Sequence, residues 1–277
     1  GATGPDRNRT ALGPLIEAGS GLSASMGYPG SGPYRSGIAW PDPVAGMHAA
    51  AAILTALADR EADPDRAGRA IEVAMIEAMG CFVGESLLAA QVRGSDTAPR
   101  GNRDPLRAPQ GCYPCAGDDR WLAISIETDE QWTALARIAA LDDLAALPLE
   151  ERTARHDELD ARIATWTRSS NPNTLMHTLQ QAGVVAMLVA DARDIVESPQ
   201  LAARNFWAVL DHPAVGLRSY PGNPIRLSDT PITYRTAAPL LGQHNRAVLT
   251  EWLDYSDAQC ETLERNAILA DRPPPIT

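Results

Sequence analysis

The sequence predicts a mixed fold of helices and strands, and three features indicate it. Residues 43–60 are dense in alanine and leucine, which favour helix. Residues 118–127 have the composition of a strand that follows a turn. Residues 184–190 form a short apolar run, typical of a buried strand, after a helix that ends at Gly183. Helices and strands therefore alternate in the middle of the chain, which predicts a compact α+β unit.

The amino-terminal third is expected to be mostly loop and helix. Its first 37 residues are rich in Gly, Ser and Pro, with an apolar patch at 12–16 that suits one short helix. The helix at 43–60 has apolar residues on nearly all sides, so it is expected to be buried, with Asp42 as its N-cap. A short strand at 70–74 and a helix at 76–92 are expected to follow.

A polar stretch rich in Pro and Gly, residues 94–111, has the composition of a linker or an active-site loop and predicts a boundary. Beyond it, Thr128 or Asp129 is expected to cap one helix, and Ser256 or Asp257 the last one. Short extended pieces are expected at 206–236. Helices are expected at 128–141, 151–170, 171–183, 192–205, 241–253 and 256–268.

Composition excludes several classes of protein and of chemistry. The net charge of -11 argues against a nucleic-acid partner, because neutralising phosphates requires a basic face. No run approaches the 18 apolar residues of a membrane span, so a cytoplasmic protein is expected. All 24 basic residues are Arg, which excludes lysine Schiff bases. Cys112 and Cys115 form a CxxC pair without further ligands at a suitable spacing, so no metal site is expected.

Asp42 has two interpretations on local chemistry. It stands in an Asp-Pro pair that opens a helix, and N-capping alone would explain the pair. A carboxylate at a helix N-terminus after a Gly-rich approach is also suited to act as a nucleophile. The pair by itself does not decide between them.

Five blocks of sequence, in order, resemble the family III CoA-transferases, the group that contains formyl-CoA and carnitine CoA-transferases. In the first block Gly37 and Asp42 keep the family's spacing of a Gly five residues before an Asp, and an Ala-rich helix follows. The last block contains an Ala-Pro-x-Leu-Gly-x-His motif. The blocks span residues 20–60, 67–79, 101–126, 179–207 and 230–249.

This resemblance implies an α/β fold, with an incomplete large Rossmann-like domain and a smaller α+β domain. Residues 1–95 would continue the large CoA-binding domain and carry the nucleophile. Residues 96–235 would form the small domain and a crossing segment, and residues 236–277 would return as helices to the large domain. Family members have about a further third of chain before this point, which supplies most contacts to CoA.

The resemblance also implies an activity and site residues. Asp42 would attack an acyl-CoA, and CoA would pass through aspartyl anhydride and aspartyl-CoA thioester intermediates to a small carboxylic acid. CoA is then a substrate, and no prosthetic group is expected. Arg9 and Thr10 fall near a family position that touches CoA. Gly101, Asn102 and Arg103 are candidates for substrate contact in a loop whose Arg103 or Arg107 would meet the acceptor carboxylate, although a solvated loop is an equal alternative.

Two other functions stay open. The chain could be a non-catalytic or half-site subunit of a split or fused enzyme, whose partner chain supplies the amino-terminal half. It could also be an acyl-CoA racemase, but the His that racemases of this fold carry upstream is missing from residues 7–19. Known family members form interlocked dimers, so a homo-oligomer is expected.

Overall fold

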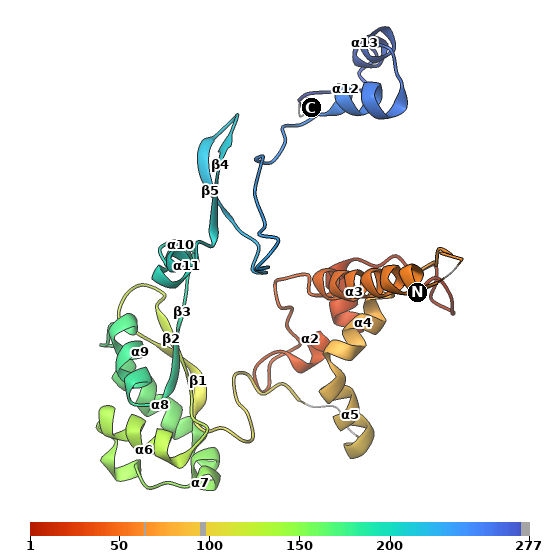
Figure 1. The fold of residues 1–277 in the computed structure, drawn as a ribbon. Coiled ribbons are helices and arrows are strands. Elements are labelled where there is room, and N and C mark those ends of the chain that lie inside the picture. Colours follow the sequence, from red (N-terminus) through yellow and green to blue (C-terminus); the bar gives the residue numbers. More distant parts are fainter. Residues whose placement is uncertain (64, 95–97, 273–277) are drawn as a thin grey trace. The chain divides into compact units, whose positions relative to one another are not determined.

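A computed structural model describes residues 1–63, 65–94 and 98–272, and the chain divides into two compact units, Gly1–Val189 and Ala190–Thr277 (Figure 1). Each unit is described by itself. The three-part division predicted from the sequence stays a prediction.

The first unit begins with helices. They are α1 (Gly13–Gly19), α2 (Leu22–Ser25), α3 (Pro41–Ala62), α4 (Met75–Phe82) and α5 (Gly84–Arg93). The predicted short helix near residue 12 is confirmed as α1, and Pro14 at its start suits the first turn, where an N–H is not needed. No single described helix has the length and hydropathy of a membrane span, whereas α4 and α5 meet both requirements only as a pair bent by 71°.

The same unit continues as an α/β region built on a three-stranded antiparallel sheet. The strands are β1 (Gln110–Pro114), β2 (Trp121–Ser125) and β3 (Val185–Val189), in the order β1-β2-β3. Cys112, Ala123 and Met187 are register partners across the sheet. The helices are α6 (Asp129–Ile138), η1 (Asp142–Leu144, a 3-10 turn), α7 (Leu149–Ala154), α8 (His156–Thr167) and α9 (Pro172–Gln181). Helices α8 and α9 pack on one face of the sheet (Figure 1).

The α/β region holds most of the buried apolar side chains. Trp132, Leu135, Leu159, Ile163 and Leu179 are at most 1% exposed and form one cluster with the buried face of the sheet. Burying side chains of this size stabilises a fold by about 1.5–3 kcal/mol each. This region therefore has a core of its own.

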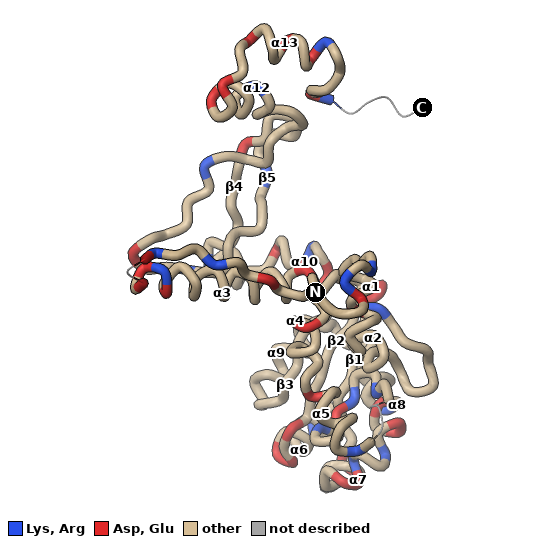
Figure 2. Tube along the Cα trace, turned by 90° about the vertical axis from the view of Figure 1, so that its right-hand side faces the viewer, with Lys and Arg blue, Asp and Glu red and all other residues tan. Residues whose placement is uncertain are grey.

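Helix α3 differs from its prediction. The helix is confirmed, but only Pro41, Val44 and Ala45 are buried within the described chain. Figure 2 shows the middle of α3 without charged residues, and Ile53 and Leu54 are 48% and 67% exposed. The expectation of a buried helix is wrong for the described chain: α1 and α4 pack on α3, but they leave most of its residues exposed or half-buried.

Two neighbouring expectations also fail. Residues 70–74 are not a strand, since they have no ladder of hydrogen bonds to another strand among the described residues. The predicted helix over 76–92 is interrupted at Val83, whose φ of -98° and ψ of 20° lie outside the helical range. Two short helices therefore replace one long helix.

The second unit contains short helices and a hairpin. Its helices are α10 (Ala192–Val196), α11 (Pro199–Ala203), α12 (Asn245–Ala247), the π-helical turn η2 (Val248–Trp252) and α13 (Asp257–Arg265). Strands β4 (Trp207–His212) and β5 (Gly216–Pro221) pair antiparallel. The predicted cap of the last helix is confirmed, since Ser256 and Gln259 form a reciprocal capping box. The single helix expected over 192–205 is two helices, because Ser198 and Pro199 begin a new one.

The α/β region confirms some local predictions and corrects others. Thr128 is the N-cap of α6 and accepts a hydrogen bond from the Gln131 N–H. Strand β1 begins at Gln110, inside the segment 94–111 that was expected to be a linker or loop. Strand β3 is confirmed as a strand, but it is an edge strand with Val185 and Met187 exposed, so it is not buried on both faces.

Candidate active site

Asp42 lies inside the first turn of α3, and this position corrects its predicted role as a cap. The N-cap residue of α3 is Trp40, and Pro41 occupies the first helical position. Proline suits that position because its φ is already helical and its missing N–H is not needed. The helix therefore starts two residues earlier than the Asp-Pro pair suggests, and Asp42 does not serve as its N-cap.

Aromatic and apolar contacts fix the start of α3. The ring of Trp40 stacks on Phe82 at the end of α4, with centroids 5.9 Å apart and planes 22° apart. Val44 and Ala45 pack in a small cluster with Ile16 of α1 and residues of α4. Asp42 is thus carried at the place where three helices meet.

The Asp42 carboxylate is exposed and lies against Gly13, the first residue of α1. A β-carbon placed on Gly13 would collide with Oδ2 of Asp42 and come within 2.9 Å of the Ala39 β-carbon. Only glycine leaves room for the carboxylate there. Among the described residues, the Asp42 side chain has no hydrogen-bond or ion-pair partner, so both of its oxygens are available to a ligand.

The approach to α3 is held by a buried acid that sequence reasoning missed. Glu17 of α1 is fully buried, and its carboxylate accepts hydrogen bonds from the N–H and the hydroxyl of Ser36 at 2.7 and 3.1 Å. Gly37 follows with a φ of 79°, a left-handed conformation that favours glycine. Nothing in the local sequence marks Glu17, because an acid on a short helix is usually solvated.

The polar loop that precedes β1 is anchored to α8. Arg103 donates through Nη2 to Asp157 and to Asp160, at 2.6 Å each. Burial acts to lower the pKa of Arg103, but the hydrogen bonds and charges of these two carboxylates outweigh it and raise that pKa. Arg107 likewise pairs with Glu127 at 2.9 Å. The expectation that Arg103 or Arg107 meets an acceptor carboxylate is not supported by this geometry, because both already have acidic partners.

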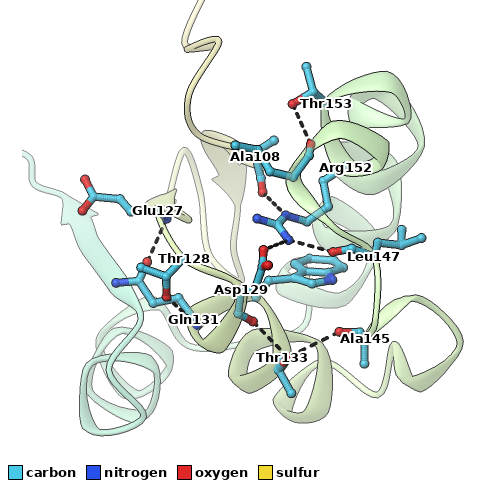
Figure 3. A network of polar contacts seen from close by, with 12 residues as sticks. Ala108, Glu127, Thr128, Asp129, Gln131, Thr133, Ala145, Leu147, Arg152 and Thr153 are labelled. Atoms are coloured by element: carbon cyan, nitrogen blue, oxygen red, sulfur yellow. Dashed lines mark hydrogen bonds and ion pairs between the residues drawn. The ribbon is translucent and has the colours of Figure 1, made fainter.

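A second anchor holds the end of the same loop (Figure 3). The guanidinium of Arg152, only 1% exposed, donates to the carbonyls of Ala108 and Leu147 at 2.7 Å each, and to Asp129 at 2.6 Å. It also lies over the ring of Trp132, 5.9 Å from the centroid. The loop therefore begins and ends on fixed contacts.

A third set of contacts joins β1 to α8. Tyr113 donates its hydroxyl to Asp160 at 2.8 Å, and burial, followed by the charge of Asp160, raises the pKa of Tyr113. His156 accepts the Gln110 N–H on Nε2 at 3.1 Å. Burial lowers the pKa of His156, although Asp160 opposes this, so the neutral ring that can accept this hydrogen bond is favoured.

A cavity of about 800 Å³ opens beside these residues. Its wall includes Tyr28, Arg100, Asn102, Cys112 and Trp121. The guanidinium of Arg100 is exposed and forms no hydrogen bond or ion pair with the part of the chain that the structure describes. The cavity therefore offers a cationic side chain next to an aromatic one.

The remaining predicted site residues fall into two places. Gly101 and Asn102 lie with Arg103 in the anchored loop, where the Gly101 N–H donates to the Gly27 carbonyl at 2.8 Å. Arg9 is exposed near the start of α1 and pairs with Asp6 at 3.0 Å, while Thr10 is exposed beside it. No hydrogen bond or ion pair among the described residues joins either group to Asp42. The chain thus presents an exposed carboxylate in one region and a cationic cavity wall in another.

The sequence profile of CoA-transferase family III matches residues 1–245. The chain is 29% identical to succinyl-CoA–D-citramalate CoA-transferase of Chloroflexus aurantiacus, over 97% of this chain and 67% of that protein. It is 28% identical to the alpha subunit of succinyl-CoA–L-malate CoA-transferase of the same organism, over 97% and 63%. It is 27% identical to succinate–glutarate CoA-transferase of Agrobacterium fabrum, over 96% and 65%. The chain therefore spans about two thirds of the length of these relatives.

The fold is also found among solved structures. The crystal structure of a CaiB/BaiF family protein from Brucella suis superposes with a TM-score of 0.76 at 24% identity, covering 90% of this chain and 65% of that one. A structure from Mycobacterium tuberculosis superposes with a TM-score of 0.67 at 20% identity, covering 89% and 65%. The mixed helix and strand fold expected from the sequence is confirmed.

Proposed function

The chain belongs to CoA-transferase family III, and from that premise we propose that it transfers CoA from an acyl-CoA to a small carboxylic acid, with Asp42 as the nucleophile. The observation that carries the proposal is the state of the Asp42 carboxylate. It is exposed, it lies in the first turn of a 22-residue helix, and it has no partner among the described residues. A carboxylate that is neither a cap nor half of an ion pair is free to react.

The donor half of the reaction follows from carboxylate chemistry. An Asp42 oxygen attacks the thioester carbonyl of the donor, and CoA thiolate leaves as a mixed anhydride forms. The thiolate then attacks the Asp42 carbonyl carbon. The donor acid departs with the bridging oxygen, and an aspartyl-CoA thioester remains.

The acceptor half reverses these steps. A carboxylate oxygen of the acceptor attacks the aspartyl carbonyl, and CoA thiolate leaves as a second anhydride forms. The thiolate attacks the acceptor carbonyl, which restores the Asp42 carboxylate and releases the new acyl-CoA. Four acyl transfers, two in each half of the reaction, replace one difficult exchange, and the chain itself supplies only Asp42 as a covalent participant.

Trapping the thioester tests this proposal. The purified protein is incubated with succinyl-CoA and hydroxylamine, digested, and mapped by mass spectrometry. A hydroxamate on Asp42, absent when hydroxylamine or succinyl-CoA is omitted, is the expected result. A reactive assembly that turns over acyl-CoA while Asp42 stays unmodified would exclude the nucleophilic role.

We propose small dicarboxylic acids as the substrate class. Three of the relatives are named for transfer involving citramalate, malate and glutarate, acids that each carry a second carboxylate that does not react. A cation binds such a group favourably, and Arg100 is exposed without a partner among the described residues, unlike Arg103 and Arg107. Transfer to succinate or malate is therefore expected to exceed transfer to a monocarboxylate such as butyrate, and Arg100→Ala is expected to reduce this preference.

A second candidate function is a half-site subunit. One relative is named as an alpha subunit, and this chain spans about two thirds of its relatives' length. A partner chain would then complete the CoA site and cover the exposed side of α3 around Leu54. Native mass spectrometry distinguishes these arrangements: a homo-oligomer that forms the hydroxamate supports the first function, and hydroxamate formation only with a second chain supports the subunit.

A further inference from the structure

Glu17 is a buried acid whose surroundings explain it only in part. Its side chain is fully buried, and no cation among the described residues pairs with it. Burying a carboxylate without compensation is unfavourable, so such groups are retained where hydrogen bonds satisfy them. Both of the hydrogen bonds to the Glu17 carboxylate come from one residue, Ser36.

Ser36 begins the segment that delivers Asp42. Its hydroxyl lies 2.7 Å from the Ile38 carbonyl as well as 3.1 Å from Glu17. Gly37 then turns the chain with a positive φ, and the Trp40 N–H donates to the Ile38 carbonyl at 2.9 Å. The residues from Ser36 to Ala39 are therefore ordered by their own turns and by the contact with Glu17, while Trp40 and Pro41 are also held by packing.

The two ends of this segment both contact helix α1. Residues four apart in a helix share a face, and Gly13 and Glu17 are four apart in α1. Glu17 holds Ser36 at one end, and Gly13 leaves the space that the Asp42 carboxylate occupies at the other. Helix α1 is therefore a short platform that the nucleophile segment spans.

We propose that Glu17 is a positioning residue for Asp42: by holding Ser36, it fixes the turn that sets the carboxylate against Gly13. This inference rests on the proposed nucleophilic role of Asp42. A carboxylate that attacks a thioester must lie within a narrow range of distance and angle, and small misplacements reduce such rates strongly. Glu17 does not touch the reacting atoms.

Three variants separate positioning from folding. Glu17→Ala removes both acceptors, while Ser36→Ala removes the hydroxyl contact and keeps the backbone one. Glu17→Gln keeps an oxygen for the Ser36 N–H, and its amide N–H can donate to the Ser36 hydroxyl, which then donates to the Ile38 carbonyl. Glu85→Ala is the matched control, because Glu85 is an exposed acid on the neighbouring helix α5.

Each variant is measured in two ways, in the assembly that forms the hydroxamate. Hydrogen exchange reports the protection of the amides from Ser36 to Asp42, and hydroxamate formation from succinyl-CoA reports the reactivity of Asp42. Glu17→Ala is expected to increase exchange in this segment alone and to slow hydroxamate formation about 10- to 100-fold. Ser36→Ala is expected to slow it roughly 3- to 10-fold. Glu17→Gln and Glu85→Ala are expected to match the wild type.

The outcomes are distinct. Faster exchange in Glu17→Ala with hydroxamate formation at the wild-type rate would show a structural contact only and overturn the positioning role. Unchanged exchange in both Glu17→Ala and Ser36→Ala would overturn the contact itself. An assembly that turns over acyl-CoA without a hydroxamate on Asp42 would refute the nucleophile, and with it positioning for catalysis, whereas the exchange measurement would still report whether Glu17 orders the segment.

Discussion

The helical region that carries Asp42 and the α/β region that follows it are stabilised in different ways. Around α1, α3 and α4 the buried cluster consists of Ile16, Val44, Ala45, Ala78 and Met79. The α/β region instead buries large side chains such as Trp132 and Ile163 around its sheet, and Arg152 adds a buried polar network. The α/β region therefore has a buried core of its own, whereas the helical region around α3 leaves much of its apolar surface exposed.

This difference separates function from stability. The exposed Asp42 carboxylate makes no contact that a fold would lose, while Arg103 and the Ala108 carbonyl in the loop at 100–109 are held by hydrogen bonds to α8 and α7. Reactivity is therefore expected to reside in the sparsely packed region, and resistance to unfolding in the densely packed one. Four changes test this division, beginning with the largest effect.

Asp42→Asn is expected to reduce CoA transfer by about 10³-fold or more, because an amide does not attack a thioester. Its free energy of unfolding should match the wild type, since the Asp42 side chain has no partner among the described residues. Asp65→Asn, an exposed acid beyond the other end of α3, is the control. Full activity in Asp42→Asn would refute the assignment.

Arg152→Met should have the opposite effect from Asp42→Asn: it should reduce stability, because Arg152 holds the structure of the α/β region. It leaves the carbonyls of Ala108 and Leu147 without a donor, and the expected loss of stability is about 3 kcal/mol. Hydrogen exchange of the β1 and β2 amides measures this loss. Arg162→Met, which removes an exposed ion pair with Asp143, should change their protection little. If both substitutions reduced amide protection equally, the buried contacts of Arg152 would contribute no more to stability than an exposed ion pair.

The same substitution in the two regions sharpens the comparison. Leu159→Ala removes a fully buried side chain and should cost about 2–5 kcal/mol. Leu54→Ala removes one that is 67% exposed and should change the free energy of unfolding by less than about 0.5 kcal/mol. Urea unfolding measures both. A large loss of unfolding free energy in Leu54→Ala would contradict the comparison, because it would show that Leu54 is packed more fully than its 67% exposure indicates.

Lowering the pH should have the smallest effect on the free energy of unfolding, and it should act through His156. Burial lowers the pKa of His156 in the folded state, so the unfolded chain binds its proton more readily. The stabilisation is complete above the unfolded pKa of about 6.5 and decreases as the pH falls toward the lower folded pKa. Unfolding free energies measured from pH 8 to pH 5 should show this loss, and His156→Gln should show less of it. An increase in stability over that interval would contradict the neutral ring that accepts the Gln110 N–H.

Sequence reasoning succeeded where the determining chemistry is local. Thr128 and Ser256 cap their helices because their hydroxyls reach N–H groups three residues ahead, and Gly183 ends α9 with a φ of 79°. Strand β1 was missed because Gly111 and Pro114 give it the composition of a loop, and only pairing with β2 makes it a strand. The apolar composition of α3 predicts that the helix can be buried. It does not show whether this chain contains the surfaces that would bury it, and most of α3 is exposed among the described residues.

The candidate site was less predictable. The motif located Asp42 but placed it at the cap, because the contribution of Pro41 to the helix start cannot be read from an Asp-Pro pair alone. Glu17 carries no sequence signal, since its partner Ser36 lies 19 residues away. Arg103 or Arg107 was expected to meet an acceptor carboxylate, and the carboxylates of this chain with which they pair are evident only in three dimensions.

Isotope transfer tests the central claim, that Asp42 is the covalent participant, most directly. In the proposed reaction the acceptor leaves one carboxylate oxygen on Asp42 in each turnover, and the donor acid removes one. With an acceptor labelled with oxygen-18 in its carboxylates, the peptide that contains Asp42 should gain the mass of one labelled oxygen after a single turnover, and no other peptide should. Turnover without label in that peptide would contradict the account.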